Sequence, residues 1–400
     1  SFSVKNFYSF RESVRISLEL DGHAPQDDRS FIAPSGTRLT KALAVIGANA
    51  SGKTTLVKVL AFLSWFINDS FQLKADAKLP LEAHFSSEGE VSEFEVEFET
   101  DNKIWRYFLK ASNERVYAEA LYAKEASSKR RFSFVFLREW VPGTISGTGS
   151  YSVKQQQFGM LQKEAEKVRT NASLISTAAQ YGVQLASQMK RISEHVFTNV
   201  HALGRRHLDF EQIFEVSKFY AENERLRRRM AMMLSKWDFG LADIRVEKVN
   251  RTDKEGKTKE IDFPFGVHLI GNKEHELALF EESSGTQSAF ILLARILPAL
   301  QKGGLVLIDE MEADLHPQML PAILDLFFSP ESNPHNAQII FTSHSIEVLS
   351  QLHKAQVELV EKDAQCESDA WRLDEVKGVR ADDNLYAKYM VGAYGATPRL

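Results

Sequence analysis

The feature that most constrains this chain is a glycine-rich octapeptide between a short apolar run and a longer apolar helix pattern. Residues 47–54 read Gly-Ala-Asn-Ala-Ser-Gly-Lys-Thr and match the phosphate-loop pattern G-x-x-x-x-G-K-[ST]. The pattern over 41–46 predicts a buried strand, and that over 54–67 predicts a helix. A strand, a tight turn and a helix N-terminus in this order bind phosphate groups. The predicted nucleotide-binding residues are Gly47, Ala48, Asn49, Ala50, Ser51, Gly52, Lys53, Thr54 and Thr55.

A second motif supplies the acidic partner that a phosphate loop needs. The run Leu-Val-Leu-Ile-Asp-Glu at 305–310 predicts a buried strand with two acids at its carboxyl end, where open α/β sheets bind ligands. Lys53 is predicted to reach the β- and γ-phosphates, and Thr54 and Asp309 are the predicted magnesium ligands. Glu310 is the predicted catalytic base, which polarises the attacking water. The predicted cofactors are ATP and Mg²⁺.

Two further segments place this chain in a subclass. Glu-Ser-Ser-Gly-Thr-Gln at 282–287 precedes a predicted helix, and Ile-Ile-Phe-Thr-Ser-His-Ser at 339–345 predicts a strand that ends on His344. The order of phosphate loop, Ser-Ser-Gly-Thr-Gln, acidic strand and strand-ending histidine resembles that of ABC-type ATPase heads, within them the RecF/SMC/OLD-like branch. In isolation, Ser-Ser-Gly-Thr would also fit a helix N-cap, and a lone histidine is more often structural than catalytic.

The resemblance implies roles for both segments. Ser284, Gly285, Thr286 and Gln287 would form the signature, which acts in trans on the γ-phosphate held by the loop of a second copy. His344 would be a second catalytic residue, contacting the γ-phosphate and helping to place the water. The signature departs from the family's LSGGQ at Thr286. The family's Q-loop glutamine has no evident counterpart, since Gln72 is the only glutamine between Thr54 and Gln155.

A finer resemblance covers nearly the whole chain. The segments SVKNFYSFRESVRISL, VRTNASLISTAAQYG, DEMEADLHP and DDNLYAKYMVGAYGATP resemble bacterial anti-phage ATPases of the abortive-infection type, such as RloA-like subunits and the ATPase of PARIS systems. This implies a dimer-facing D-loop with Asp314 and His316, a homodimer or higher homo-oligomer, and a phage-derived trigger protein. OLD-like nucleases carry a Toprim domain after the ATPase part. Since 56 residues follow His344, we expect a separate effector in trans, a Toprim-type or other nuclease.

The spacing of apolar residues changes several times along the chain. These changes predict an α/β head with inserted parts. Period-two alternation between about 85 and 140 indicates antiparallel strands, and helical spacing prevails from 153 to 237. The last 120 residues alternate between helix patterns (287–300, 317–328, 346–352) and strand patterns (305–309, 338–342), which indicates a parallel sheet. We predict a P-loop ABC-type head with a mixed sheet and flanking helices, divided into 1–85 (N-terminal part of the head), 86–150 (β-rich insertion), 151–240 (helical lobe) and 241–400 (C-terminal part of the head).

Charge and cysteine content limit the partners and the cellular compartment that we expect for the protein. Lys plus Arg number 49 against 54 Asp plus Glu, so no attraction of the whole chain to nucleic acid is expected. Three local basic clusters, 129–131, 205–207 and 225–229, fit either a nucleic acid contact or solvated helix faces. The single cysteine, Cys366, excludes an internal disulfide framework. No apolar run is long enough for a bilayer span. We therefore expect a cytoplasmic protein without a membrane partner.

Two functions of other classes also fit the sequence. One is a DNA-repair or chromosome-maintenance ATPase of the RecF/SMC type, which would bind nucleic acid directly. The other is the ATPase subunit of a transporter, which the Asn-Phe-Tyr-Ser-Phe element at 6–10 and the large inserted parts disfavour. ATP-dependent, salt-sensitive DNA binding would favour the first, and a membrane partner would favour the second.

Overall fold

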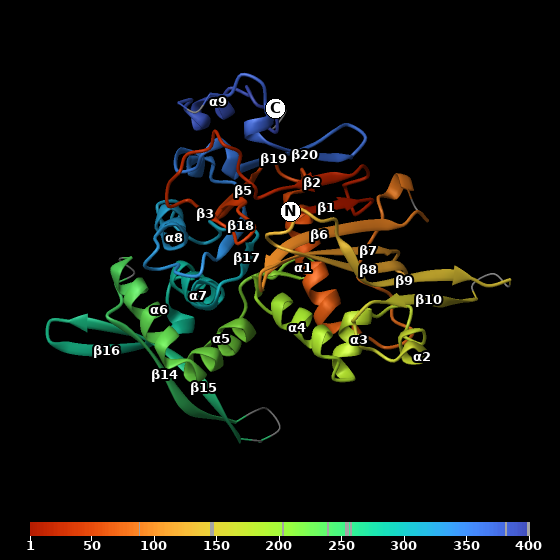
Figure 1. Cartoon of the computed structure of the whole chain (residues 1–400). Coiled ribbons are helices and arrows are strands. Elements are labelled where there is room, and N and C mark those ends of the chain that lie inside the picture. Colours follow the sequence, from red (N-terminus) through yellow and green to blue (C-terminus); the bar gives the residue numbers. More distant parts are fainter. Residues whose placement is uncertain are drawn as a thin grey trace.

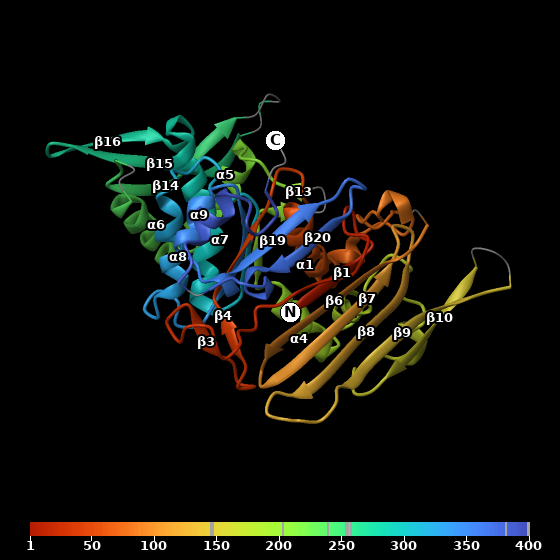
Figure 2. The same ribbon diagram turned by 90° about the horizontal axis from the view of Figure 1, so that it is seen from above.

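The computed structural model describes residues 1–87, 89–144, 148–201, 204–237, 240–252, 256, 258–380 and 382–397. Two large sheets dominate it: a six-stranded mixed sheet in the order β11-β17-β18-β5-β19-β20, and a seven-stranded antiparallel sheet in the order β10-β9-β8-β7-β6-β1-β2. Helix α1 (Lys53–Asp69) packs between them in a shared apolar core (Figures 1 and 2). The predicted α/β class with a mixed sheet and flanking helices is confirmed.

The mixed sheet is parallel except at one edge. Strand β20 pairs antiparallel with β19, while the other neighbours pair in parallel. Along β5, Leu43 and Val45 face the core that contains α1, while Ala42, Ala44 and Ile46 face a second core beneath α7 and α8. Both faces are therefore covered, which explains the continuous apolar runs. The strands are β5 (Ala42–Ile46), β11 (Val196–Thr198), β17 (Leu305–Ile308), β18 (Gln338–Ser343), β19 (Val357–Lys362) and β20 (Ser368–Arg372).

The antiparallel sheet contains the predicted strands of 85–140 together with two strands from the N-terminal 20 residues. Its inner face carries Phe94, Trp105 and Tyr107, all buried. The strands are β1 (Phe2–Lys5), β2 (Val14–Ile16), β6 (Ser92–Thr100), β7 (Lys103–Ala111), β8 (Val116–Glu125), β9 (Ser133–Pro142) and β10 (Gly149–Gln155). The predicted boundary at 150/151 falls inside β10, because Tyr151 and Val153 continue the buried alternation of this sheet. Positions 145–147 lie outside the described residues.

The helices of 151–240 pack in two groups, because β11 and the short pair β12 (Val200–His201) and β13 (Gly204–Arg205) lie between them in sequence. The first group joins the core around α1, and the second joins the core of α7 and α8. We retain the predicted division into head, insertion and lobe as a proposal only. The first group is α2 (Gln162–Ala165), α3 (Leu174–Gln180) and α4 (Gln184–Ser193); the second is α5 (Phe210–Glu222) and α6 (Glu224–Lys236).

A three-stranded antiparallel sheet projects from the body beside α5 and α6 (Figures 1 and 2). It consists of β14 (Asp243–Thr252), β15 (Thr258–Ile270) and β16 (Lys273–Ala278). Positions 253–255 and 257, between β14 and β15, lie outside the described residues. The remaining elements are β3 (Ser30–Ile32), β4 (Arg38–Thr40), α7 (Ser284–Lys302), α8 (Met319–Phe328), α9 (Leu385–Met390) and the 3₁₀ helices η1 (Ser70–Gln72), η2 (Phe85–Ser87), η3 (Leu279–Glu281), η4 (Ile346–Ser350), η5 (Lys354–Gln356) and η6 (Leu373–Glu375).

Two predicted helices differ from the observed ones. Helix α8 begins at Met319 rather than at Pro317, because His316 and Pro317 first form a turn in which the carbonyl of His316 accepts from Met319 N. The segment after His344 is the 3₁₀ helix η4, held by bonds between residues three apart. In the described part of the chain, no helix combines the length and apolar character needed to cross a membrane.

Candidate nucleotide-binding site

Three adjacent parallel strands carry the predicted site to one edge of the mixed sheet. Strand β5 ends at Ile46, immediately before the glycine-rich loop, and β18 ends at Ser343, immediately before His344. Strand β17 ends at Ile308, immediately before Asp309. Their register pairs Ile46 with Ser343 and Ile308 with Phe341. Segments separated by up to about 300 residues in sequence therefore meet at the carboxyl edge, where open α/β sheets bind ligands.

The loop at 47–54 adopts a conformation that needs both of its glycines. Gly52 has φ of 113° and precedes α1, and a Cβ there would lie 2.7 Å from Ser368 Oγ. Gly47 is surrounded even more closely, since a Cβ there would lie 2.1 Å from the carbonyl oxygen of Val360 on β19. The loop is thus fixed against neighbouring backbone, with its amides at the N-terminus of α1, the arrangement that binds anions.

Lys53 folds back over this loop. Its Nζ donates hydrogen bonds of 2.9 Å to each of the carbonyl oxygens of Gly47 and Ala48. Burial lowers the pKa of Lys53, while the nearby carboxylates of Asp309 and Glu310 act to raise it. A cation in a water-poor loop beside a helix N-terminus is a favourable partner for a phosphate group.

Thr54 and Asp309 lie together and can share a metal ion. The Thr54 hydroxyl donates to Asp309 Oδ1 and Oδ2 at 3.0 and 2.9 Å, and Thr342 Oγ1 donates to Oδ1 at 2.7 Å. A hydroxyl and a carboxylate oxygen suit Mg²⁺, which commonly takes one or two protein ligands and completes its shell with water and substrate phosphates. The described residues contain no group of three His, Cys, Asp or Glu side chains that could hold a metal alone. These ligands therefore fit a magnesium ion that arrives with a nucleotide.

Glu310 lies at the end of β17 with its carboxylate between two partners. Its backbone has a left-handed φ of 52°, and its N–H donates to Thr342 Oγ1 at 2.7 Å. Glu310 Oε1 lies 3.6 Å from His344 Nε2, and Oε2 forms an ion pair with Arg205 Nη1. The structure thus brings the predicted base and the predicted histidine into one cluster beside the predicted metal ligands.

A cavity of about 560 Å³ opens over these groups. Residues 49–55 line it together with Asp309, Glu310 and His344. Sequence analysis missed four of its lining residues: Tyr8, Ser9, Thr342 and Lys362. Tyr8 lies in the turn after β1, and the Lys58 ammonium lies 3.9 Å from the centre of its ring. The Asn-Phe-Tyr-Ser-Phe element identifies this turn in the sequence, but nothing local indicates that it reaches the loop.

The predicted signature lies apart from this cavity. Its residues begin α7, where Ser283 is the N-cap and accepts from the Thr286 N–H at 3.2 Å. Ser284 is exposed, whereas Thr286 is buried and the Gln287 amide donates to the Glu282 carbonyl at 2.8 Å. None of the described residues 284–287 lines the cavity. The predicted D-loop residues Asp314 and His316 are also exposed.

Asn199 is a further site residue that sequence analysis missed. It follows β11, which pairs in parallel with β17. Its Oδ1 accepts from Asp309 N at 2.8 Å, and its Nδ2 donates to the Asp309 carbonyl at 2.9 Å. The side chain therefore fixes the backbone of Asp309, the predicted metal ligand. A single asparagine 110 positions before Asp309 gives no local signal of this role.

The side chains of the three basic clusters make different interactions. Arg205 pairs with Glu310, and Arg206 pairs with Glu215 at 2.8 Å. In the cluster at 225–229, Arg227 and Arg229 donate to backbone carbonyls, and Arg228 pairs with Glu224. Only the cluster at 129–131 has all of its basic side chains exposed.

These features fit a P-loop ATPase of α/β architecture: a glycine-rich loop before a helix, a hydroxyl and a carboxylate that suit Mg²⁺, and a second carboxylate that lines the same cavity. Residues 43–350 match the family model described as "AAA domain, putative AbiEii toxin, Type IV TA system". The match spans more than three quarters of the chain, and the chain belongs to this family. It is therefore an ATPase of the AAA type. No curated protein matches the chain.

Solved structures of SMC head domains are similar to the chain at low identity. One, from Thermotoga maritima, has 12% identity and a TM-score of 0.42, covering 94% of this chain and 98% of that chain. An Smc head bound to the C-winged helix domain of ScpA has 13% identity and a TM-score of 0.44, with coverages of 94% and 98%. An Smc head with an extended coiled coil, bound to the C-terminal domain of ScpA derived from Pyrococcus furiosus, has 12% identity and a TM-score of 0.39, with coverages of 94% and 96%.

Proposed function

We propose that the chain hydrolyses ATP at a site shared between two copies, and that this activity controls a separate effector in anti-phage defence. The observation that carries the proposal is the division of the predicted site. The phosphate loop, Asp309, Glu310 and His344 converge on one cavity, while Ser284 lies exposed outside it. A second copy would bring its Ser284 segment to the γ-phosphate, and the exposed D-loop would lie beside the same contact.

The hydrolysis step needs few protein groups. The water oxygen forms a bond to the γ-phosphorus as the bond to the β–γ bridging oxygen breaks, giving ADP and phosphate. Glu310 orients the water and takes its proton, and His344 lies beside it for contact with the γ-phosphate. Thr54 and Asp309 would hold Mg²⁺, which neutralises charge on the β- and γ-oxygens. Lys53 would neutralise charge from the loop side.

The defence role rests on two kinds of support. The description of the matching family includes an abortive-infection-type toxin of a toxin–antitoxin system. Segments such as 309–317 and 382–398 resemble abortive-infection ATPases. On this basis the chain would be the ATP-dependent sensor or scaffold subunit, its effector would be a nuclease acting in trans, and its trigger would be a phage protein.

A mixing experiment tests the shared site. Lys53→Ala and Ser284→Arg chains should each be inactive alone, because one lacks the phosphate contact and the other blocks the signature. Mixed in equal amounts, they form a dimer with one intact site, so roughly a quarter of the wild-type ATPase activity should return in a statistical mixture. A mixture that stays inactive while its chains still associate, measured by analytical ultracentrifugation, would contradict a site in trans.

A second function is favoured by one observation. The basic side chains at 129–131 lie exposed at the turn between β8 and β9. Such a cluster suits a nucleic acid backbone, as in a RecF/SMC-like DNA-repair or chromosome-maintenance ATPase. ATP-dependent DNA binding that weakens steeply with salt, and that is lost when all three positions become alanine, would replace the effector model with this one.

A further inference from the structure

The segment after β11 places two arginines beside the candidate site. Strand β12 (Val200–His201) and strand β13 (Gly204–Arg205) form a short antiparallel pair that packs against α1. Asn199 holds the start of this segment on the backbone of Asp309. This strand pair therefore holds Arg205 in place beside the end of β17, and Arg205 does not lie on a free surface loop.

Arg205 and His344 lie near different oxygens of the candidate base. Its Nη1 contacts Glu310 Oε2, while His344 Nε2 lies 3.6 Å from the other oxygen, Oε1. The Arg205 side chain is only 17% exposed. Its Nε is buried and has no hydrogen-bond partner among the described residues. An arginine that is held this way and engages a carboxylate through one nitrogen leaves the second oxygen free for water.

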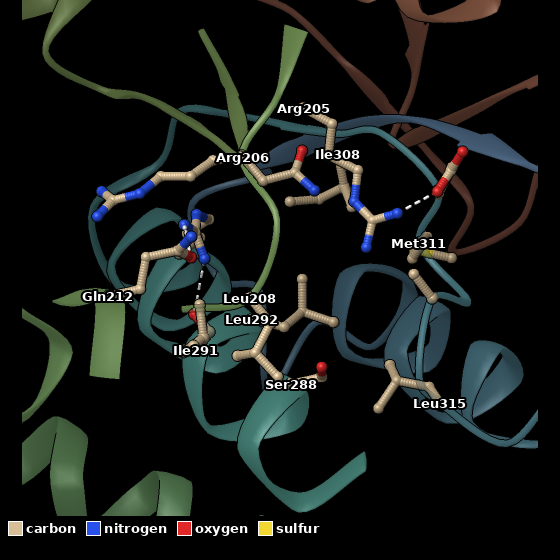
Figure 3. Close-up of a pocket in the computed structure, with 14 residues that line it drawn as sticks. Arg205, Arg206, Leu208, Gln212, Ser288, Ile291, Leu292, Ile308, Met311 and Leu315 are labelled. Atoms are coloured by element: carbon tan, nitrogen blue, oxygen red, sulfur yellow. Dashed lines mark hydrogen bonds and ion pairs between the residues drawn. The ribbon is translucent and has the colours of Figure 1, made fainter. Parts of the chain in front are cut away.

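The neighbouring Arg206 provides a natural contrast. Figure 3 shows the two side chains leaving adjacent positions in different directions, with Arg205 on the side of Met311. Arg206 pairs with Glu215 on α5, at 2.8 Å, and does not reach the acidic pair at the strand end. Both arginines line a cavity of about 60 Å³ behind Glu310. Only one of the two is therefore placed to act on the base.

We infer that Arg205 is a positioning residue for the proposed ATPase, an inference that rests on the proposed function. It fixes the carboxylate of Glu310 through Oε2, so that Oε1 is directed to the cavity where the attacking water would lie. A base that is oriented by a third group is a recurrent arrangement in hydrolases. Misplacement of a catalytic group by about 1 Å can cost about 100-fold in rate. Arg205 touches neither the loop nor the metal ligands in the described contacts, so it acts through Glu310 alone.

A double-mutant cycle on turnover tests this inference. Arg205→Ala should lower kcat by about 10- to 100-fold, with KM and ATP affinity by calorimetry unchanged, because no predicted nucleotide contact is lost. Arg205→Lys should recover part of the rate. In a Glu310→Gln background, Arg205→Ala should have no further effect, because the residue that it positions is already inactive. Arg206→Ala, at the adjacent position, should keep wild-type turnover.

The possible outcomes distinguish a failure of the positioning role from a failure of the proposed function. A wild-type chain that hydrolyses no ATP would overturn both. An active wild type with an equally active or faster Arg205→Ala chain would overturn the positioning role only. Independent losses that multiply in the double variant would show that Arg205 acts on something other than Glu310. A reduced unfolding temperature with unchanged kcat would assign the ion pair to stability alone, which also contradicts the inference.

Discussion

The two halves of the predicted nucleotide site are built very differently. Contacts within the chain fix the phosphate-loop half. Asp309 receives hydrogen bonds from Thr54 and Thr342, and Asn199 fixes its backbone. The signature half begins α7 with Ser284 exposed and without a place in the cavity. Contacts within the chain hold the first half in place, whereas the described residues of the second half do not line the cavity. Nucleotide binding and nucleotide hydrolysis should therefore respond to different mutations.

The largest expected effect concerns the phosphate-loop half. Lys53→Ala removes the cation over the loop and should raise the dissociation constant for ATP above about 1 mM, which amounts to loss of binding in calorimetry. Lys103 on β7, whose side chain is 43% exposed, offers a control, since Lys103→Ala should bind ATP as the wild type does. Unchanged affinity in the Lys53 variant would remove the loop from the nucleotide site.

The second effect separates chemistry from binding. Glu310→Gln keeps the shape of the side chain but removes its ability to accept a proton, so turnover should fall by about 10²- to 10⁴-fold. ATP should still bind, and the ATP-bound dimer should accumulate in size-exclusion chromatography. Glu347→Gln, on η4, is the control. Undiminished hydrolysis by the Glu310 variant would assign the base to another residue.

The signature half should show the reverse of the Lys53 result. Ser284→Arg places a long cation at an exposed position, so the chain should fold and bind ATP with wild-type affinity. Its turnover should fall by about 10²- to 10³-fold, the loss typical of one missing contact to a developing charge. Ser350→Arg, also exposed, should leave turnover unchanged. If Ser284→Arg weakened ATP binding by the monomer, the two halves would be parts of one site within the chain.

The smallest expected effect concerns a histidine that contacts Glu282, just before the signature residues. His268 on β15 contacts Glu282 Oε1 through Nε2 at 2.7 Å and the Gly240 carbonyl through Nδ1 at 3.0 Å. The bond to Glu282 raises the pKa of His268. Because this pKa is higher in the folded chain, the stabilisation is complete below the unfolded value of about 6.5 and is lost as pH rises through the folded value. His268→Gln should therefore lower the unfolding temperature by about 1–2 °C at pH 6 and by less at pH 9.

His275 provides the control for this pH dependence, because it is exposed on β16 opposite His268. His275→Gln should unfold at the wild-type temperature at both pH values. Equal shifts at pH 6 and pH 9 for His268→Gln would show that the ring acts by packing rather than by its charge.

How far the sequence predicted this molecule depended on the range of each interaction. The loop at 47–54 and the acidic end at 309–310 are contiguous patterns, and the alternation over 305–343 indicated the parallel sheet that joins them. Asn199 and Arg205 could not be predicted, because their roles arise from the pairing of β11 with β17, more than 100 residues away in sequence. The helices of 151–240 join two different cores for the same reason, since β11 enters the mixed sheet between them in sequence.

The close approach of Ser368 to the phosphate loop affects how the chain folds during its synthesis. The Ser368 hydroxyl donates to the Ser51 carbonyl at 2.6 Å, and its N–H donates to the Ser9 carbonyl at 2.7 Å. The loop is thus closed by residues from both ends of the described chain. During synthesis, which proceeds at about 5–20 residues per second, residues 47–54 leave the ribosome long before Ser368. A nascent chain should therefore carry an unfinished loop for most of its synthesis and should acquire its support only near the end.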